Sequence, residues 1–200
     1  MSTAEDPGRA GGEQRRLRRD AAVNQELVLR AAVAAVLREG DQVPMSVIAA
    51  EAGVGVGTLY RRYPNREALL DALTCRAFTV VLGCARAADR TDQPGLACLD
   101  SFLDGVLARR GELVLPLHGG PAELSTGARA IRSQLHETLR GVLGRGLLDG
   151  SVRPDATTWD VVVFGAVLAR PLPNAPDWPR TAARLKTVYL DGLAGVRPRQ

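Results

Sequence analysis

An all-α fold is predicted for this chain of 200 residues. Apolar residues recur over most of the sequence at the three- and four-residue spacing of amphipathic helices, and no segment of useful length shows the two-residue alternation of a strand. Breaks rich in glycine and proline divide the sequence into segments of helical length. Together these observations predict about nine helices and no internal repeat.

The N-terminal third is predicted to hold a tail and three helices. Residues 1–18 lack periodicity, carry several arginines and are expected to form a disordered basic tail. Helices are expected over about 21–39, 44–52 and 56–62, the second starting at a proline because proline suits a first helical turn. The third helix must end before Pro64, because proline disfavours helical geometry in the residue that precedes it.

The rest of the chain is predicted to form mostly longer helices. Asn65 can accept hydrogen bonds from the free amides of a helix that continues to about residue 89. The helices that follow are expected at about 95–109, 112–118, 121–149, 155–169 and 177–194. Segments such as TDQPG and PLPNAPDWP separate them.

The composition is that of a folded protein without a membrane or export segment. Hydrophobic residues make up 46% of the chain, but no uninterrupted apolar run approaches the roughly 18 residues of a membrane helix. The start of the chain contains arginines and no apolar block, so no secretory signal is predicted. Cys75, Cys84 and Cys98 are odd in number and match no metal or redox spacing, which favours packing in the core. A cytoplasmic location is expected.

The segment from residue 44 to 70, PMSVIAAEAGVGVGTLYRRYPNREALL, is predicted to form two short helices that cross tightly and the start of a third. Gly53 would supply the positive φ of the turn between the two, and Leu59 and Tyr63 would face the first helix. The opposite side of the second helix then carries small residues, hydroxyls and two arginines. Such a surface suits the major groove of DNA, where small residues let the backbone approach base edges and Thr58 can donate to a phosphate.

The placing of the basic residues also favours DNA as a partner. The net charge is only +4, but Arg15, Arg16, Arg18 and Arg19 gather just upstream of the motif. A basic run is usually a solvated tail. Its position beside a DNA-binding motif favours contact with phosphates instead.

Two other interpretations fit parts of the motif. GVGVGT is similar to a dinucleotide-binding loop, but the pattern G-x-G-x-x-G needs glycine at the position of Thr58, and a strand rather than a helix should come before it. The second interpretation is a purely structural helix-turn-helix inside an unrelated bundle, which the residues leave open.

The stretch from about Arg19 to Leu73 resembles the DNA-binding domain of the TetR family. The family's series is carried here by Ile48-Ala49, Ala52-Gly53-Val54, Gly57-Thr58-Leu59-Tyr60, Tyr63 and Arg66. The resemblance implies that Thr58 and Tyr60 contact the operator backbone. It also implies that Arg66, where the family usually has lysine, binds a phosphate.

Two departures from the family pattern reduce the expected contacts. Gly55 occupies a position that often holds serine or another base-reading residue, and Pro44 stands where a threonine cap is common. Fewer direct base contacts and one phosphate contact fewer are therefore expected. The full set of predicted DNA-binding residues is Arg15, Arg16, Arg18, Arg19, Ser46, Gly55, Val56, Gly57, Thr58, Tyr60, Arg61, Arg62 and Arg66.

For the remaining chain, the resemblance implies a helical body that encloses an effector pocket and pairs with a second subunit through its last two long helices. A lining of Leu, Val and Ala would favour a small apolar or amphipathic effector. The pocket candidates are Phe78, Leu82, Phe102, Val106, His118, Leu135, His136 and Trp159. The candidates for the homodimer interface are Val161, Gly165, Ala166, Leu168, Ala169, Val188 and Tyr189.

No catalytic or metal-binding pattern occurs in the sequence. His118 and His136 are the only histidines, and neither H-E-x-x-H nor G-x-S-x-G is found. Each histidine is expected to be an ordinary core or surface residue, or else a polar contact in a pocket. We therefore expect no enzymatic activity, no metal and no cofactor.

The predicted function is that of a transcriptional repressor released from a palindromic operator in double-stranded DNA by a small-molecule effector. Residues 19–73 would form the DNA-binding domain, and residues 74–200 the regulatory and dimerisation domain. The alternative is a dimeric DNA-binding protein of the same fold without small-molecule input, whose body serves dimerisation or a protein partner. A cavity in the body would favour the first function, and a body filled by side chains would favour the second.

Overall fold

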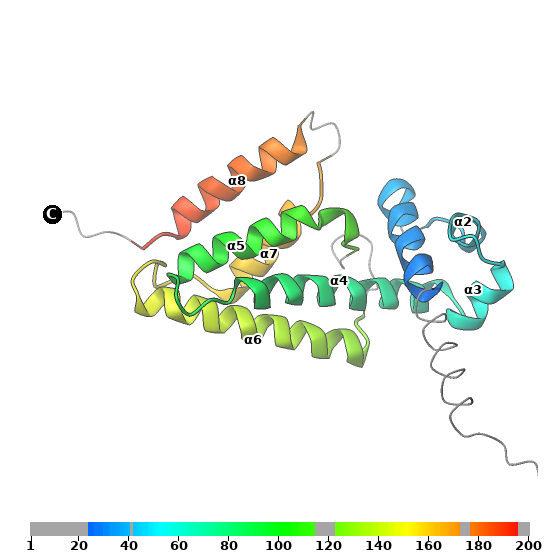
Figure 1. Cartoon of the computed structure of the whole chain (residues 1–200), viewed down its shortest axis with the longest axis horizontal. Coiled ribbons are helices and arrows are strands. Elements are labelled where there is room, and N and C mark those ends of the chain that lie inside the picture. Colours follow the sequence, from blue (N-terminus) through cyan, green and yellow to red (C-terminus); the bar gives the residue numbers. More distant parts are fainter. Residues whose placement is uncertain (1–23, 41, 115–122, 173–176, 196–200) are drawn as a thin grey trace, which may run out of the picture. The chain divides into compact units, whose positions relative to one another are not determined.

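The computed structural model describes residues 24–40, 42–114, 123–172 and 177–195 (Figure 1). Within these residues the regular structure is α-helical, apart from one 3-10 turn and an isolated β-bridge. The predicted all-α fold class is confirmed. The chain divides into two compact units, the first ending at Arg66 and the second beginning at Glu67.

The described part of the first unit is a helix over residues 24–39 followed by two short helices, α2 (Met45–Glu51) and α3 (Val56–Arg62). Gly53 lies in the turn between α2 and α3 with a φ of +65°. Glycine adopts this left-handed conformation without a steric penalty, because it has no Cβ. The turn is the one that the sequence predicts.

The apolar sides of these helices form the core of the first unit. Its buried side chains are Val28, Leu29, Ala32, Val33, Ala35, Val36, Val43, Met45, Ile48, Ala49, Leu59 and Tyr63. Leu59 and Tyr63 therefore turn one side of α3 inward. The remaining side chains of α3 are exposed.

The second unit is built from five helices in the described residues. These are α4 (Arg66–Ala88, whose first residue closes the first unit), α5 (Gly95–Ala108), α6 (Thr126–Leu148), α7 (Thr158–Leu168) and α8 (Trp178–Leu193). Helix α5 packs on α6, α7 and α8, and α6 also packs on α7. Cys84 and Cys98 are buried in this core as predicted, whereas Cys75 is half-buried, and all three are free thiols.

Helix α8 is attached to the body by polar as well as apolar contacts. The Lys186 ammonium pairs with both Asp100 and Asp104 of α5, at 2.5 Å from each carboxylate, and its side chain is only 12% exposed. At the start of α8, the buried Trp178 indole donates to the Leu168 carbonyl oxygen at 3.2 Å. These contacts hold the last helix against α5 and the end of α7.

Two helices start later than the apolar pattern predicts, because a capping residue sets their first turn. The Ser125 hydroxyl accepts from the Ala128 amide at 3.1 Å, so α6 begins at Thr126 rather than near residue 121. Thr157 and Asp160 form a reciprocal capping box, so α7 begins at Thr158 rather than near residue 155. Apolar periodicity locates a helix but not the residue that caps it.

The helix expected over 112–118 is wrong in its described part. A short 3-10 turn, η1 (Arg110–Glu112), is followed by Leu113 in extended conformation. Residues 115–118 lie outside the described residues. Leu113 and Val114 are both completely buried, so their apolar character serves the core and not a helix stripe.

Helix α4 is long and apolar enough to cross a membrane by length and composition alone. However, 56% of its most apolar window is buried inside the protein. Its buried side chains include Leu73, Ala77, Phe78, Val81 and Ala85. The apolarity of α4 is thus accounted for by its place in the core.

Candidate functional site

Helix α3 presents an exposed face that contains most of the predicted DNA-contacting residues. Val56 and Tyr60 are 42% and 46% exposed, although apolar and aromatic side chains are usually covered. The exposed residues of this face are Gly55, Val56, Gly57, Thr58, Tyr60, Arg61 and Arg62. Ser46 is exposed on α2. The structure therefore leaves every predicted contact residue of residues 55–62 exposed, around the buried Leu59.

The two α3 arginines are held by hydrogen bonds within the first unit. The Arg61 guanidinium donates to the Thr58 hydroxyl at 3.2 Å. The Arg62 guanidinium donates to the side-chain oxygen of Gln25, on the helix over 24–39. Thr58, Arg61 and Arg62 are exposed and Gln25 is half-buried, so these bonds can exchange for phosphate oxygens at little cost.

Arg66 occupies a different environment from the α3 arginines. Its guanidinium donates to the Val43 carbonyl oxygen at 2.7 Å and is partly buried. It thereby ties the start of α4 to the segment before α2. The resemblance implied a phosphate contact for Arg66, and the structure adds a positioning role that sequence reasoning missed.

The two glycines of α3 have no packing reason to be glycine. A Cβ at Gly57 would meet no other atom within 4 Å, and a Cβ at Gly55 would meet only the Thr58 hydroxyl, at 3.8 Å. Neither residue has a positive φ, in contrast to Gly53. The bare backbone of this face is therefore open to a partner that approaches closely. The predicted contact residues Arg15, Arg16, Arg18 and Arg19 lie outside the described residues.

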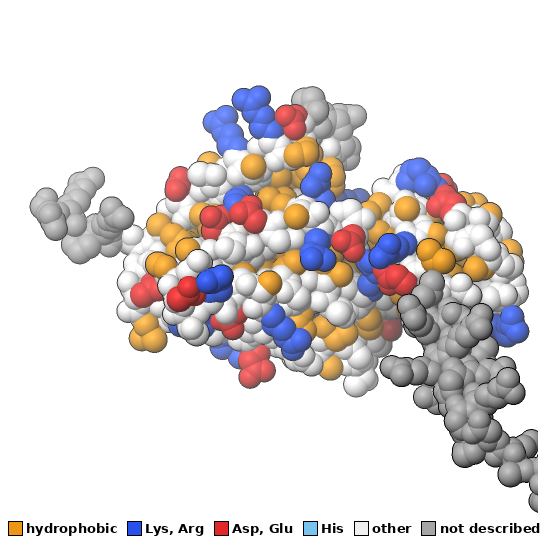
Figure 2. All heavy atoms as spheres, viewed as in Figure 1, with side chains coloured by type: hydrophobic (Ala, Val, Ile, Leu, Met, Phe, Trp, Pro, Cys, Tyr) orange, Lys and Arg blue, Asp and Glu red, His pale blue; other side chains and the backbone are white. Residues whose placement is uncertain are grey.

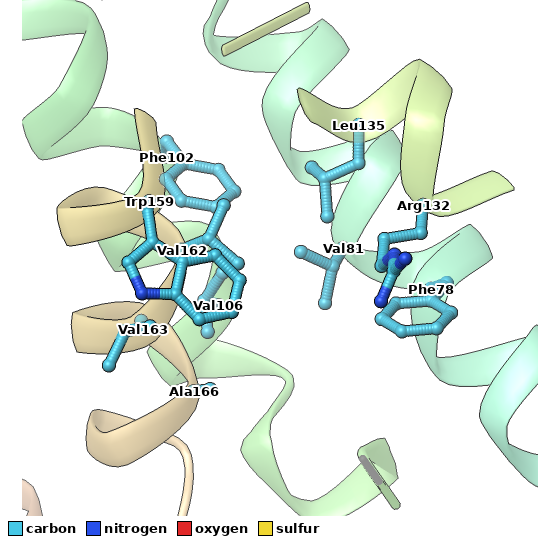
Figure 3. A pocket seen from close by; sticks show the side chains of 11 residues that line it. Phe78, Val81, Phe102, Val106, Arg132, Leu135, Trp159, Val162, Val163 and Ala166 are labelled. Atoms are coloured by element: carbon cyan, nitrogen blue, oxygen red, sulfur yellow. The ribbon is translucent and has the colours of Figure 1, made fainter. Parts of the chain in front are cut away.

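The second unit contains a cavity of about 420 Å³. Four helices line it: α4 with Phe78 and Val81, α5 with Phe102 and Val106, α6 with Arg132 and Leu135, and α7 with Trp159, Val162, Val163, Gly165 and Ala166. Figure 3 shows the α7 side chains facing those of α4 and α6 across the hollow. The volume lies within the roughly 300–1,000 Å³ that is usual for small-molecule pockets.

Five of the eight pocket candidates line this cavity. These are Phe78, Phe102, Val106, Leu135 and Trp159. Leu82 is buried in the core but does not line the cavity. His136 is also absent from the lining, and His118 lies outside the described residues.

His136 instead contacts one of the lining residues, Trp159. Its ring stacks on Trp159 with 6.3 Å between the centroids. Its Nε2 is buried and has no hydrogen-bond partner among the residues that the structure describes. Burial lowers the pKa of His136 from its ordinary value, and the charges of Arg132 and Arg140 lower it further. The imidazole is therefore neutral at pH 7.

Most of the predicted interface residues of α7 are buried within their own subunit. Val161, Leu168 and Ala169 are at most 3% exposed. Gly165 is buried against Phe102 and Leu103, and it lines the cavity together with Ala166. Ala166 is half-buried. These five interface assignments stay predictions, although little of these side chains is left exposed for a partner. Helix α7 is apolar on nearly all sides, so its sequence does not show which side faces the core of its own subunit.

The surface of α7, α8 and the segment after α7 nevertheless carries exposed apolar side chains. These are Trp159, Val167, Leu172, Leu185 and Val188, with exposed fractions from 40% to 62%. Figure 2 shows apolar side chains at the surface around α8, among charged ones. Of the predicted interface residues, Val188 belongs to this set. Tyr189 is half-buried and stacks on Phe164, with ring centroids 3.8 Å apart.

Comparison with known proteins agrees with this geometry. Residues 28–73 match the family model described as bacterial regulatory proteins, tetR family. No curated protein matches the sequence significantly. The chain is 29% identical to the TetR transcription regulatory protein from Mycobacterium vanbaalenii, with a TM-score of 0.61 over 89% of this chain and 99% of that one.

Two further solved structures have the same fold. A TetR transcriptional regulator from Streptomyces coelicolor is 28% identical, with a TM-score of 0.56 over 86% of this chain and 99% of that one. A bacterial regulatory protein in the tetR family from Rhodococcus RHA1 is 20% identical, with a TM-score of 0.68 over 87% and 98% of the two chains.

A helix-turn-helix unit followed by a helical body defines a DNA-binding transcriptional regulator. Residues 28–73 form a DNA-binding domain of the TetR family type, and the chain as a whole is similar in fold to TetR-family regulators.

Proposed function

We propose that this protein is a repressor that binds palindromic operator DNA as a homodimer and is released when a small amphipathic or apolar molecule enters the body. The observation that carries the proposal is the cavity of about 420 Å³ in the second unit. Its lining is apolar apart from one arginine. A DNA-binding protein without small-molecule input has no need of such a space, because close packing of the body is more stable.

The DNA contacts follow from the exposed face of α3. In a helix-turn-helix protein the second helix of the motif enters the major groove, and side chains around it contact the phosphates. We expect Thr58, Tyr60, Arg61 and Arg62 to make those phosphate contacts, since all four are exposed. The open backbone at Gly55 and Gly57 allows α3 to come close to the base edges.

The homodimer follows from the exposed apolar residues of α7 and α8. An isologous interface brings two copies of one patch together, and a stable one buries more than roughly 1,000 Å². Val167, Leu185 and Val188 are the centre of the proposed patch. Two subunits then present two α3 helices to two half-sites, in the cytoplasm where the DNA is.

The proposed functional boundary lies within α4. Residues 19–73 would act as the DNA-binding domain and residues 74–200 as the regulatory domain. Helix α4 starts at the last residue of the first unit and continues through the second, where Phe78 and Val81 line the cavity. A single covalent element therefore links the two proposed activities.

The test compares wild type with a variant whose cavity is filled. The operator is first selected from random DNA duplexes, and small amphiphiles are then screened for release of the operator in a gel-shift assay. Ala166→Phe places a ring in the cavity, whereas Ala130→Phe adds the same bulk on an exposed position of α6. We expect Ala166→Phe to bind the operator like wild type but to resist release.

Two results would count against the proposal. If Ala166→Phe is released as readily as wild type, the cavity is not the effector site. If no amphiphile releases wild type at millimolar concentration, the dimeric DNA-binding protein without small-molecule input becomes the better account.

A further inference from the structure

The cavity has an apolar interior and a polar rim. Phe102, Val106 and Leu135 are at most 2% exposed and form its deep wall. Arg132 is the only charged residue in the lining, and both it and Trp159 are exposed. Figure 3 shows Arg132 and Phe78 across the hollow from the α7 side chains. A positive charge therefore stands at the edge of a chamber that is otherwise apolar.

Arg132 has no partner among the described residues, unlike several other arginines of the second unit. On the same helix, Arg129 donates to the Leu124 carbonyl oxygen at 2.6 Å, and Arg145 pairs with Asp89. Arg86 donates to the Gln134 side chain at 2.9 Å. The structure gives Arg132 no hydrogen bond and no ion pair in the described part of the chain, so its five N–H donors are available.

The charge of Arg132 is also not balanced locally. His136 is one helical turn further along α6, and the charges of Arg132 and Arg140 add to burial in lowering its pKa. No carboxylate contributes to that shift. The positive charges of Arg132 and Arg140 thus both reach this part of α6, and an anion bound beside Arg132 would gain from them.

We propose, building on the proposed function, that the effector is an amphipathic anion whose carboxylate pairs with Arg132 at the rim while its apolar body fills the chamber between α5, α6 and α7. The guanidinium offers two parallel donors that match a carboxylate. A carboxylate at an exposed arginine also keeps part of its hydration, so it avoids the large cost of complete burial. The chain of such a ligand would lie against Phe102, Val106 and Leu135.

Three ligands with the same ten-carbon chain test the proposal: decanoate, decanol and decylammonium. Their affinities for the full-length protein are measured by isothermal titration calorimetry, below the concentration at which any of them forms micelles. We expect decanoate to bind about tenfold more tightly than decanol, because an ionic hydrogen bond at a partly exposed site has about this effect. Decylammonium should bind most weakly, since its charge is repelled by the rim.

Two variants assign the preference to Arg132. Arg132→Gln should reduce the affinity for decanoate to that for decanol and leave decanol unchanged. Arg140→Gln removes an equal charge from the same helix, at a position outside the cavity lining, and should keep most of the preference for the acid. Arg132→Lys should retain part of it, because the charge remains and the paired donors are lost.

The proposal is overturned if wild type binds decanol as tightly as decanoate, if Arg132→Gln keeps the preference for the acid, or if wild type binds none of the three ligands. Failure of the anion proposal is distinguishable from failure of the proposed function. Release of the operator by decanol as readily as by decanoate would remove the role of Arg132 but leave an effector-controlled repressor.

Discussion

Two glycines of the helix-turn-helix differ in what their missing Cβ does. Gly53 has a φ of +65°, a conformation that strains any L side chain, whereas Gly57 is helical and has open space around its Cβ position. The first glycine is required by the fold. The second is required only if DNA approaches the α3 backbone.

The matched substitutions to alanine separate these two roles. Gly53→Ala should lower the free energy of unfolding by about 1 kcal/mol, because alanine is strained at positive φ. Gly57→Ala should leave stability unchanged or raise it by up to about 1 kcal/mol, because alanine favours the helix. It should nevertheless weaken operator binding about tenfold or more, since its methyl group keeps the backbone away from the bases. Urea denaturation and gel-shift titration give the two readouts. Wild-type operator affinity in Gly57→Ala would show that α3 does not approach so closely.

Arg62 and Arg66 provide a second matched pair. Arg66→Ala removes the hydrogen bond to the Val43 carbonyl oxygen and should cost about 1–2 kcal/mol of stability. Arg62→Ala changes an exposed side chain and should change stability by no more than about 0.5 kcal/mol. If both bind phosphates, each variant should also reduce the slope of log affinity against log salt concentration by about one. An unchanged slope in Arg66→Ala would make Arg66 a positioning residue only.

The half-buried Tyr189 hydroxyl should make the fold less stable in alkaline solution. Burial, with a smaller contribution from the charge of Asp160, raises the pKa of Tyr189 to about 12. The unfolded chain ionises this hydroxyl near 10, so the protonated form stabilises the fold fully below pH 10 and progressively less as the pH rises toward 12. Between these values wild type should lose about 1–2 kcal/mol relative to Tyr189→Phe. Urea denaturation of both proteins at several pH values measures the difference, and parallel curves would contradict the assignment.

At the scale of elements, one side of α7 packs into the core of its own subunit, and only the other side is available to a partner subunit. Its buried residues Val161, Gly165 and Leu168 lie three and four positions apart, and exposed Trp159 and Val167 lie on the other side. A dimer must therefore use the second set together with residues of α8. A substitution of Gly165 by a large residue cannot test the interface, because the new side chain would meet Phe102 and Leu103 in the same subunit.

The proposed interface can be tested on α8. Val188 is 62% exposed, and Val188→Arg places a charge where two apolar surfaces would meet. Analytical ultracentrifugation should show a monomer at micromolar concentration for this variant and a dimer for wild type. Ala130→Arg, which adds the same charge on exposed α6, should remain dimeric. A dimeric Val188→Arg protein would place the interface elsewhere.

At the scale of the whole molecule, effector binding and operator binding must change each other's affinity by the same factor. An effector that releases the operator must bind the DNA-free form more tightly, and the operator must then weaken the effector by the same factor. A hundredfold preference corresponds to about 2.7 kcal/mol, enough to empty an operator held near its dissociation constant.

Decanoate titrations with and without saturating operator measure this linkage. We expect an affinity up to about a hundredfold lower when the operator is bound. The cavity-filling variant Ala166→Phe provides the baseline for binding outside the cavity. Equal affinities in the two titrations would mean that decanoate occupies the body without controlling DNA binding.

The sequence alone was sufficient for the helix-turn-helix and the fold class. A turn glycine, a proline that ends a helix and a stripe of apolar residues all act over a few neighbouring positions, so their effects are visible in the order of residues. Gly53, the end of α3 at Arg62 and the exposed face of residues 55–62 were predicted for this reason. The residues that cap α6 and α7, Ser125 and Thr157, act just as locally, but the apolar pattern does not single them out.

Only the tertiary structure shows which apolar residues of the second unit lie in the core, in the cavity wall or at the surface. Phe102 and Trp159, which were predicted for a pocket, line the cavity, whereas Leu82 does not. Gly165, which was predicted for the dimer interface, is buried against Phe102 and Leu103. Core, cavity wall and dimer surface are all apolar, and only the packing of four helices distinguishes them. Arg132 was missed because nothing in the sequence distinguishes it from the other 25 basic residues. Only the structure shows that it lies among the apolar residues of the cavity lining.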